Sequence, residues 1–372
     1  MTYASRLAQP GILSLSPYIP GKPVSELQRE LGISRVVKLA SNENPLGPSP
    51  LVLEAVRQAS QELHLYPDGA GYEVKQALAG MLAVGPEQIT LGNGSNEVLE
   101  LLARVFLGVE SEAIYSAHAF AVYPLVTQAV GARGVVAPAH DGSRGVRFAH
   151  DLDAMLAKVT ASTRLIFIAN PNNPTGTWLG ADELARFLDA LPDHVMTVID
   201  EAYFEYVTEK NYPDTVRWLG RYPGLVVTRT FSKAYGLAGL RLGYSVSSPE
   251  TADLLNRARE PFNVNHLAQA AAVAALKDRA YLDASVSLNA EGLLSLTSAL
   301  EARGFEVIPS VGNFVTFDLR ESAEPVYQSL LRQGVIVRPV ANYALPDHLR
   351  VSVGTAQENA AFLAALDRVL RL

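Results

Sequence analysis

The feature of this sequence that most constrains its fold is a repeated alternation of short apolar runs with helical patterns. The apolar runs have the length of buried strands and occupy residues 113–116, 165–169, 195–199 and 225–230. Between them, apolar residues recur at helical spacing, as in 95–107 and 181–191. Strands that alternate with helices form a mostly parallel sheet with helices on both faces. The sequence therefore predicts an α/β fold with a large domain built on such a sheet.

The two ends of the chain depart from this pattern. Prolines at positions 10, 17, 20 and 23 interrupt the first 35 residues, which we expect to form an irregular arm that lies on another part of the protein. A long helical stretch, roughly 265–303, precedes shorter strand patterns, and the final helix opens with the capping box Thr355-x-x-Glu358. We therefore predict an N-terminal arm (1–35), a large domain (36–260) and a smaller C-terminal α+β domain (261–372) that packs with the N-terminal segment.

Composition argues against several classes of protein. Of the 372 residues, 48% are apolar and 19% are charged, which is enough for a sizeable core. The net charge is −7 without a basic block, so we expect no nucleic-acid partner. There is no cysteine, and the seven histidines lack metal-binding spacing, so we expect no metal. The sequence also has no apolar run near the ~18 residues of a membrane span and no segment resembling a signal peptide, which favours a cytoplasmic protein that does not bind membranes.

Polar residues that follow strands are candidates for a site, because the sites of open α/β sheets lie at the carboxyl ends of the strands. The sequence GNGSNE (92–97) follows a predicted strand and brings Gly94, Ser95 and Asn96 to the start of a helix. Free N–H groups at a helix start bind phosphate, although a tight turn capped by Ser95 explains the sequence equally well. A dinucleotide-binding fingerprint is disfavoured, because Glu97 occupies the position of its third glycine.

Two further strand ends carry polar groups. The sequence NPNNPTG (170–176) forms a turn that its prolines make rigid, so the amide of Asn173 can be aimed with little loss of entropy. Asx turns that satisfy their own backbone would explain two of its three asparagines without any function. Asp200 ends the next strand, where burial is unfavourable unless an arginine or a pyridinium nitrogen meets the carboxylate. Tyr203, three residues later, could point at the same group.

The fourth strand end continues into FSKAYGLAGLRLGY (231–244). A lysine in a turn is usually a solvated charge, but Lys233 is expected in the same crevice as Asp200. Ser232 beside it and Arg241 downstream can both hold a phosphate, and the glycines let the backbone wind closely around such a group. The combination favours Lys233 as the amine that binds an aldehyde cofactor.

Together these motifs resemble those of pyridoxal-phosphate enzymes of the aspartate aminotransferase fold type, over nearly the whole chain. Within that fold type the chain resembles the histidinol-phosphate aminotransferases in LASNENPLGPSP (39–50), YPD (66–68), NPNNPTG, DEAY (200–203), FSKAYGLAGLRLGY and PFNVN (261–265). Phenylalanine and tyrosine aminotransferases and a threonine-phosphate decarboxylase have similar motifs. The resemblance implies fold type I, pyridoxal 5′-phosphate as cofactor, and a homodimer with shared active sites.

The resemblance also implies roles for the residues around the cofactor. Lys233 would hold it covalently and move a proton between substrate and cofactor, while Asp200 would keep the pyridine nitrogen protonated. Asn173 and Tyr203 would hydrogen-bond the phenolic oxygen of the ring. Phe120 would stack on the ring, where related enzymes commonly have tyrosine. The cofactor phosphate would be bound by Gly94, Ser95, Asn96, Ser232 and Arg241, with Tyr66 from the second subunit.

For substrates, the resemblance implies a set of residues that includes two arginines of the small domain. Arg350 would bind the α-carboxylate of glutamate, to which a guanidinium can donate two parallel hydrogen bonds. Arg338 would meet the substrate phosphate together with Tyr18, and Asn44 would also contact substrate. An exposed arginine on a strand is the alternative for both arginines.

The implied activity is a ping-pong transamination in histidine biosynthesis. L-glutamate would donate its amino group to imidazole-acetol phosphate, giving L-histidinol phosphate and 2-oxoglutarate, or the reverse. Aromatic aminotransferase activity on the same scaffold is the alternative, followed by a non-catalytic binding protein of the same fold.

Overall fold

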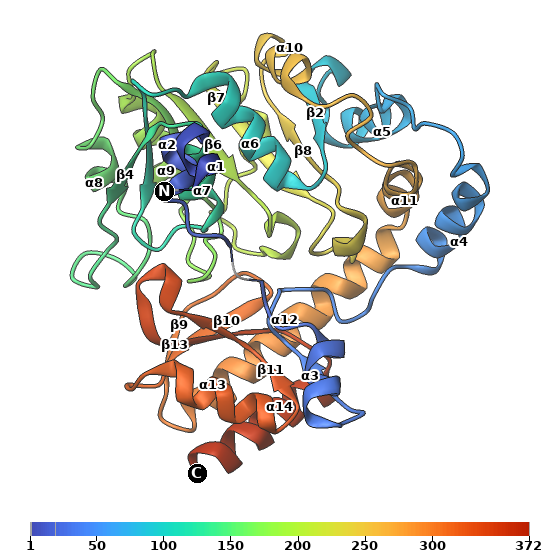
Figure 1. The fold of residues 1–372 in the computed structure, drawn as a ribbon, viewed down its shortest axis with the longest axis vertical. Coiled ribbons are helices and arrows are strands. Elements are labelled where there is room, and N and C mark those ends of the chain that lie inside the picture. The colour runs from blue at the N-terminus through green and yellow to red at the C-terminus, as the bar shows by residue number, and fades with distance from the viewer. Residues whose placement is uncertain (1, 19, 372) are drawn as a thin grey trace.

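In a computed structural model of the protein, which describes residues 2–18 and 20–371, a seven-stranded sheet forms the centre of the larger part of the chain (Figure 1). The strand order is β2-β8-β7-β6-β5-β3-β4. The strands are β2 (Ile89–Gly92), β3 (Glu112–Ser116), β4 (Arg133–Ala137), β5 (Thr163–Ala169), β6 (Met196–Asp200), β7 (Leu225–Thr230) and β8 (Gly243–Val246). Only β8 runs antiparallel to its neighbours β2 and β7, so the predicted mostly parallel sheet is confirmed.

Helices cover both faces of this sheet. They are α4 (Pro50–Ala59), α5 (Tyr72–Leu82), α6 (Ser95–Phe106), α7 (Val122–Ala129), α8 (Leu152–Leu156), α9 (Ala181–Ala190), α10 (Pro249–Ala258) and α11 (His266–Lys277). Along β5, Ile166 and Ile168 belong to the apolar cluster on one face, and Leu165 and Phe167 to the cluster on the other. Successive side chains of a strand point to opposite faces, so a strand buried on both faces is apolar throughout.

The rest of the chain, called the small part below, is built on a four-stranded antiparallel sheet. Its strand order is β12-β13-β10-β9. Its strands are β9 (Glu306–Ile308), β10 (Phe314–Asp318), β12 (Arg338–Val340) and β13 (Leu345–Ser352). Three helices accompany it, namely α12 (Arg279–Glu301), α13 (Ala323–Arg332) and α14 (Ala356–Leu370). A separate parallel pair joins β1 (Val37–Lys38) to β11 (Val335–Ile336). The capping box is present, since Thr355 Oγ1 accepts from the N–H of Glu358.

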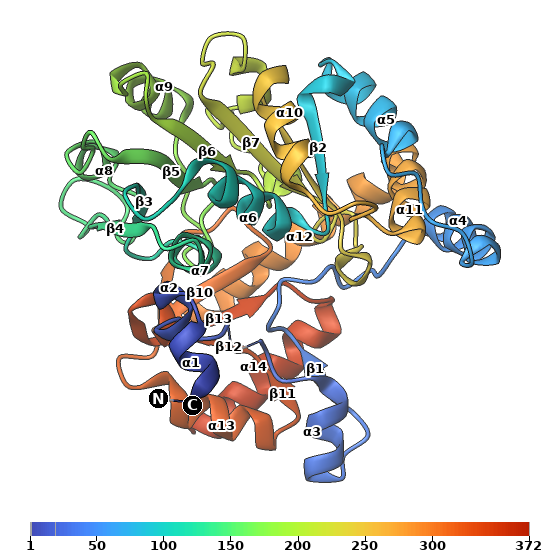
Figure 2. The ribbon, with the colours of Figure 1, turned by 45° about the horizontal axis from the view of Figure 1, so that its top comes forward.

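The N-terminal arm is only partly irregular, which corrects the prediction from its prolines. It contains α1 (Tyr3–Leu7), α2 (Pro10–Leu13) and α3 (Val24–Leu31). Pro10 is the first residue of α2 and Pro23 immediately precedes α3, positions at which a proline begins a helix instead of breaking one. The α2 segment contacts α7 of the large part, where Gln128 Nε2 donates to the Gly11 carbonyl (Figure 2). The α3 helix buries Leu27 against the small part.

The long helical stretch predicted over 265–303 is in fact two helices. Asp278 separates α11 from α12 with a non-helical backbone (φ −94°, ψ 69°), and its carboxylate accepts from the N–H of Tyr281. A side chain that caps the backbone can end one helix and begin the next, which helical periodicity alone does not show. The α12 helix then leads from the large part into the small one (Figure 1).

The buried apolar residues form separate clusters around the two sheets. Val264 and Leu282 belong to the apolar cluster of the large sheet, whereas Val37 and Leu39 pack with the small sheet and its helices. The domain boundaries predicted at 35 and 260 stay predictions. Short 3₁₀ helices lie at Ser60–Glu62, Pro86–Gln88, Phe204–Tyr206, Thr215–Trp218, Ala238–Leu240 and Ala341–Tyr343. Across residues 2–18 and 20–371, none of the helices has both the length and the apolar character that a membrane span requires.

Candidate active site

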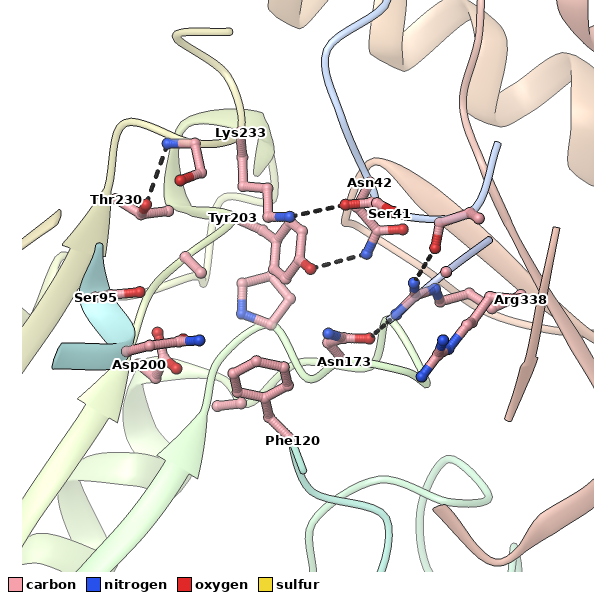
Figure 3. Close-up of a pocket in the computed structure, with 18 of the residues that line it drawn as sticks. Ser41, Asn42, Ser95, Phe120, Asn173, Asp200, Tyr203, Thr230, Lys233 and Arg338 are labelled. Carbon is pink, nitrogen blue, oxygen red and sulfur yellow. Dashed lines mark hydrogen bonds between the residues drawn. The ribbon is translucent and has the colours of Figure 1, made fainter. Parts of the chain in front are cut away.

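A cavity of about 170 Å³ lies at the carboxyl ends of β5, β6 and β7, bordered by the small part and by the N-terminal arm. Most of the residues predicted for the site line it, although they come from distant parts of the sequence (Figure 3). They are Tyr18, Ser95, Asn96, Phe120, Asn173, Asp200, Tyr203, Ser232, Lys233, Arg241, Arg338 and Arg350. The parallel strands end at one edge of the sheet, which explains how motifs far apart along the chain meet there.

Lys233 extends from the turn after β7 into the cavity. Its Nζ donates to the carbonyl of Ser41 at 3.1 Å and lies 5.7 Å from the centroid of the Tyr203 ring. Burial lowers the pKa of Lys233 from 10.5 to about 7, and the positive charge of Arg350 acts in the same direction. An amine with this pKa is substantially unprotonated at neutral pH, so it can act as a nucleophile and as a base.

Asp200 ends β6 with a buried carboxylate that has two hydroxyl partners. Tyr123 Oη donates to Oδ2 at 2.9 Å, and Thr228 Oγ1 donates to Oδ1 at 3.1 Å. Burial raises the pKa of Asp200, while these hydrogen bonds partly oppose the shift. A carboxylate buried among hydroxyl groups calls for a compensating cation in the cavity, and a protonated pyridine nitrogen meets that requirement.

Three segments form a cradle of polar groups that can bind a phosphate. The first turn of α6 begins at Ser95 with no side-chain cap on its N–H groups. A Cβ atom on Gly94, whose φ is 81°, would lie 2.3 Å from Arg241 Nη2, and one on Gly243 would lie 2.2 Å from the Ser95 nitrogen. Ser232 Oγ accepts from Arg241 Nη1 at 3.5 Å. Free N–H groups, a hydroxyl and a guanidinium in such close approach fit a phosphate dianion.

The rigid turn after β5 uses its asparagines in two ways. Asn170 and Asn172 hold the turn itself, since Asn170 Oδ1 accepts from the N–H of Leu179 at 2.9 Å and Asn172 Nδ2 donates to Thr175 Oγ1 at 2.8 Å. Asn173 lines the cavity, and its Oδ1 accepts from Arg350 Nη1. The amide Nδ2 of Asn173 therefore remains as the donor that this turn can offer to a ligand.

The small part contributes two arginines to the cavity. Arg350 on β13 is 5% exposed, and its Nη2 donates to the Ala40 carbonyl at 2.6 Å. Its Nε has no hydrogen-bond partner among the described residues, and burial lowers its pKa. Arg338 on β12 lies with its guanidinium carbon 5.5 Å from the centroid of the Tyr18 ring, which comes from the N-terminal arm. The cavity thus has two cationic groups in addition to Arg241.

Three of the predicted residues do not line the cavity. Gly94 lies just behind Arg241, as described above. Asn44 is buried elsewhere, and its Nδ2 donates to the Ala234 carbonyl at 2.9 Å and to Ser285 Oγ at 2.8 Å. Tyr66 is 83% exposed and stacks on Phe262 with ring centroids 4.8 Å apart. No contact in the described chain connects Tyr66 to the cavity.

Sequence reasoning missed several residues that line the cavity or support it. Asn42, not Asn44, lies in the cavity, and its Nδ2 donates to Tyr203 Oη at 2.8 Å. Tyr123 and Thr228 support Asp200 from behind. The sequence LASNENP did not show which of its two asparagines faces the cavity. The left-handed backbone at Asn42 (φ 54°) interrupts the regular alternation of side chains that a strand would have. Thr228 lies two residues before the end of β7, on the same strand face as Thr230, and that spacing is a signal that could have found it.

Comparisons with known proteins agree with this geometry. Residues 34–366 match the family model for aminotransferase class I and II. The chain is 63% identical to histidinol-phosphate aminotransferase 2 of Methylococcus capsulatus, over 98% of each chain. It is 55% identical to histidinol-phosphate aminotransferase 1 of Nitrosococcus oceani, over 98% of this chain and 97% of that one.

Solved structures have the same architecture. Histidinol-phosphate aminotransferase from Sinorhizobium meliloti, crystallised in complex with pyridoxal 5′-phosphate, is 31% identical with a TM-score of 0.89, over 98% of this chain and 97% of that one. A single-mutant aspartate aminotransferase of Thermus thermophilus, 22% identical over 97% of this chain and 99% of that one, has a TM-score of 0.84 and shows the fold alone. The chain therefore belongs to the class I and II aminotransferases and, among them, to the histidinol-phosphate aminotransferase family.

Proposed function

We propose that this protein is a pyridoxal-phosphate-dependent transaminase that exchanges the amino group between L-histidinol phosphate and 2-oxoglutarate, as a step of histidine biosynthesis. The observation that carries the proposal is Lys233, an amine whose pKa is lowered to about 7, in one cavity with a buried carboxylate and a phosphate cradle. The relatives named above support the choice of substrates.

Pyridoxal phosphate, when bound, supplies an electron sink for carbanion chemistry at the substrate Cα. The chain's own residues do the rest. Lys233 Nζ would hold the cofactor through its aldehyde and, when free, would move a proton between the substrate Cα and the cofactor. Asp200 would keep the ring nitrogen protonated, Phe120 would lie against the ring, and the cradle at Ser95 would hold the phosphate.

The two arginines of the small part favour a phosphorylated substrate over an aromatic amino acid. Arg350 binds the α-carboxylate of glutamate, and Arg338 with Tyr18 binds the phosphate of histidinol phosphate. A cavity for phenylalanine would need one cation for its one carboxylate, whereas this cavity is lined by Arg338 and Arg350 as well as Arg241. Arg338 as a second substrate cation supports histidinol phosphate over phenylalanine as the amino donor.

We also propose that the enzyme works as a homodimer in the cytoplasm, with Tyr66 reaching the cofactor phosphate of the partner subunit. The segment that carries Tyr66 exposes a set of large apolar side chains, which a second copy would cover. They are Leu46, Leu51, Leu53, Leu63, Leu65, Tyr66 and Tyr72.

The first test is the visible absorption of the purified protein loaded with pyridoxal phosphate. We expect low concentrations of L-histidinol phosphate to bleach the band of the bound cofactor, and equal concentrations of L-phenylalanine to leave it nearly unchanged. The variant Arg338→Met should weaken the response to histidinol phosphate and leave the weak response to phenylalanine as it is. Equal bleaching by phenylalanine would assign aromatic transamination, and a protein without any band after cofactor addition would refute the enzyme hypothesis.

A further inference from the structure

Asn42 is an unusual residue for the wall of a catalytic cavity. It is 1% exposed and its φ of 54° lies in the left-handed region, which residues other than glycine seldom adopt. Asparagine is among the residues that tolerate this conformation, but strain of this kind persists only where the surroundings hold it. The contacts of Asn42 show what holds it.

Two residues of the small part hold the Asn42 backbone. The N–H of Asn42 donates to Ser352 Oγ at 2.8 Å, and its carbonyl accepts from Asn313 Nδ2 at 3.0 Å. Ser352 lies on β13, two residues after Arg350, so both residues belong to the same face of that strand. The cavity wall at Asn42 is therefore tied directly to the strand that carries the carboxylate-binding arginine.

The hydrogen bonds also fix the direction of the Asn42 amide. Ser352 Oγ already accepts the N–H of Asn42, and its own proton is donated to Asn42 Oδ1 at 3.0 Å. With Oδ1 engaged by Ser352, the amide Nδ2 faces Tyr203 Oη and donates to it at 2.8 Å (Figure 3). A hydroxyl that accepts from an amide keeps its single proton for another acceptor.

No acceptor for that proton is present among the described residues. Tyr203 Oη has Asn42 as its hydrogen-bond partner, and the tyrosine ring lines the cavity beside Lys233. The proton of Tyr203 is therefore available to a ligand that fills the cavity. The side-chain hydrogen bonds thus form a relay with one direction: Ser352 donates to Asn42, and Asn42 donates to Tyr203.

We propose that Asn42 is a positioning residue that forces Tyr203 to act as a hydrogen-bond donor to the phenolic oxygen of the cofactor, with Ser352 fixing the direction of the relay. The inference rests on the proposed function, because it needs a cofactor with a phenolate at that place. A donor to the phenolate draws electron density away from the neighbouring lysine nitrogen, so it makes the proton on that nitrogen more acidic. Removing Asn42 weakens the donor and shifts the titration of the bound cofactor to higher pH.

The test uses four variants of the full chain loaded with pyridoxal phosphate: Asn42→Gly, Asn42→Asp, Tyr203→Phe and the double variant Asn42→Gly/Tyr203→Phe. Glycine suits the left-handed backbone, so it removes the side chain without straining the segment. Aspartate keeps the shape but replaces the donor by an acceptor, which would take the tyrosine proton away from the cofactor. The measurement is the pH midpoint of the visible band, with the dissociation constant for pyridoxal phosphate as a second reading.

We expect the midpoint to rise in Asn42→Gly, to rise further in Asn42→Asp, and to rise in Tyr203→Phe. The double variant should have the midpoint of Tyr203→Phe alone, because Asn42 acts only through the hydroxyl. The charged groups that face Lys233 are Arg350, Glu43, Arg241 and Asp200, and those facing Tyr203 are Arg350 and Asp200, so neither position changes a charge in the Gly and Phe variants. Asn211→Gly, at an exposed position outside the cavity, serves as the matched control and should leave the midpoint in place.

If Asn42→Gly shifts the pH midpoint equally in the wild type and in Tyr203→Phe, Asn42 does not act through the tyrosine and the proposal is overturned. A folded Asn42→Asp protein with an unchanged midpoint would overturn it as well. Thermal unfolding of each cofactor-free variant identifies any protein that fails to fold. A wild-type protein that binds no pyridoxal phosphate would instead refute the proposed function, so the two failures are distinguishable.

Discussion

The amine of Lys233 illustrates how a single residue can be unfavourable for folding and still suit the role proposed for it in the cavity. In the unfolded chain it carries a full charge in water, whereas in the folded protein burial lowers its pKa to about 7. Between about pH 7 and the ordinary value of 10.5, the unfolded chain therefore binds more protons than the folded one. The free energy of unfolding rises with pH in this window, because stability increases wherever the unfolded state holds the extra proton.

This gives a stability prediction for the cofactor-free protein. Replacing Lys233 by methionine removes the titrating group, so Lys233→Met should be more stable than the wild type at pH 7. The difference should shrink by on the order of 2 kcal/mol between pH 7 and 9. Urea denaturation of both proteins at the two pH values measures it, and a pH-independent difference would show that burial does not shift the lysine.

Arg350 is the subject of the second prediction. Its guanidinium is held by the Ala40 carbonyl and by Asn173, so its position is set before any substrate arrives. Lysine in its place keeps a charge but cannot donate in parallel to a carboxylate, and kcat/KM for glutamate should fall about 100-fold, close to 3 kcal/mol. Steady-state kinetics with glutamate measure the effect.

The matched control is Arg338→Lys in the same small part. It should reduce kcat/KM for histidinol phosphate more than for glutamate, because Arg338 is proposed to meet the phosphate. Equal losses for both substrates in both variants would show that the arginines do not have separate tasks.

At this scale the sequence indicated the cavity residues that follow strands better than the residues that are placed by contacts between distant segments. Lys233 and Asp200 stand directly after strands, so the edge of a parallel sheet brings them into one cavity whatever the details of packing. Asn42 and Tyr123 are placed by contacts with β13 and β6 that no local pattern shows. Asn44, which was expected at the substrate, is instead used to tie its segment to Ser285.

Among the elements, the junction of α11 and α12 depends on one side chain. Asp278 caps α12 through the N–H of Tyr281, and an N-cap of this kind contributes about 1 kcal/mol. Asp278→Ala should lower the free energy of unfolding by that amount. The control on the same helix is Asp283→Ala, which removes only an exposed pair with Arg279 and should lower it by about 0.3–0.5 kcal/mol. Urea denaturation of the three proteins compares them, and equal losses would contradict a capping role.

Elements could be predicted where their signals are local. The strand β7 (Leu225–Thr230) has the predicted bounds, because a continuous apolar run buried on both faces leaves little choice. The prediction of an irregular arm was wrong in part because a proline can either begin a helix or prevent one. The residues that follow the proline decide which of the two occurs. The break at Asp278 was not predicted, because apolar residues keep their helical spacing on both sides of it.

For the whole molecule, the proposed dimer makes a prediction about mixing. If Tyr66 serves the partner's cavity, a heterodimer of Lys233→Ala and Tyr66→Ala subunits has one intact site. At limiting cofactor, Tyr66→Ala alone should have little activity because it binds the cofactor phosphate more weakly. Mixing the two proteins after mild dissociation should then restore about one quarter of wild-type activity, since half of the dimers are mixed and each has one working site.

The control pair is Lys233→Ala with Arg350→Ala. Both residues line the same cavity of one chain, so no mixed dimer regains a complete site and activity should stay absent. Recovery in this pair, or its lack in the first pair at limiting cofactor, would contradict a shared site.

The parallel pair of β1 with β11 has a consequence for how the molecule can be divided. Val37 and Leu39 pack into the small sheet, although they precede the large sheet in sequence, so the small part is assembled from both ends of the chain. The polypeptide passes between the two parts from α2 to α3, then at residues 39–49, and again through α12. A gene rearrangement that exchanged the small part for another would have to replace two separate coding segments together, whereas point substitutions at Arg338 or Arg350 change its chemistry in a single step.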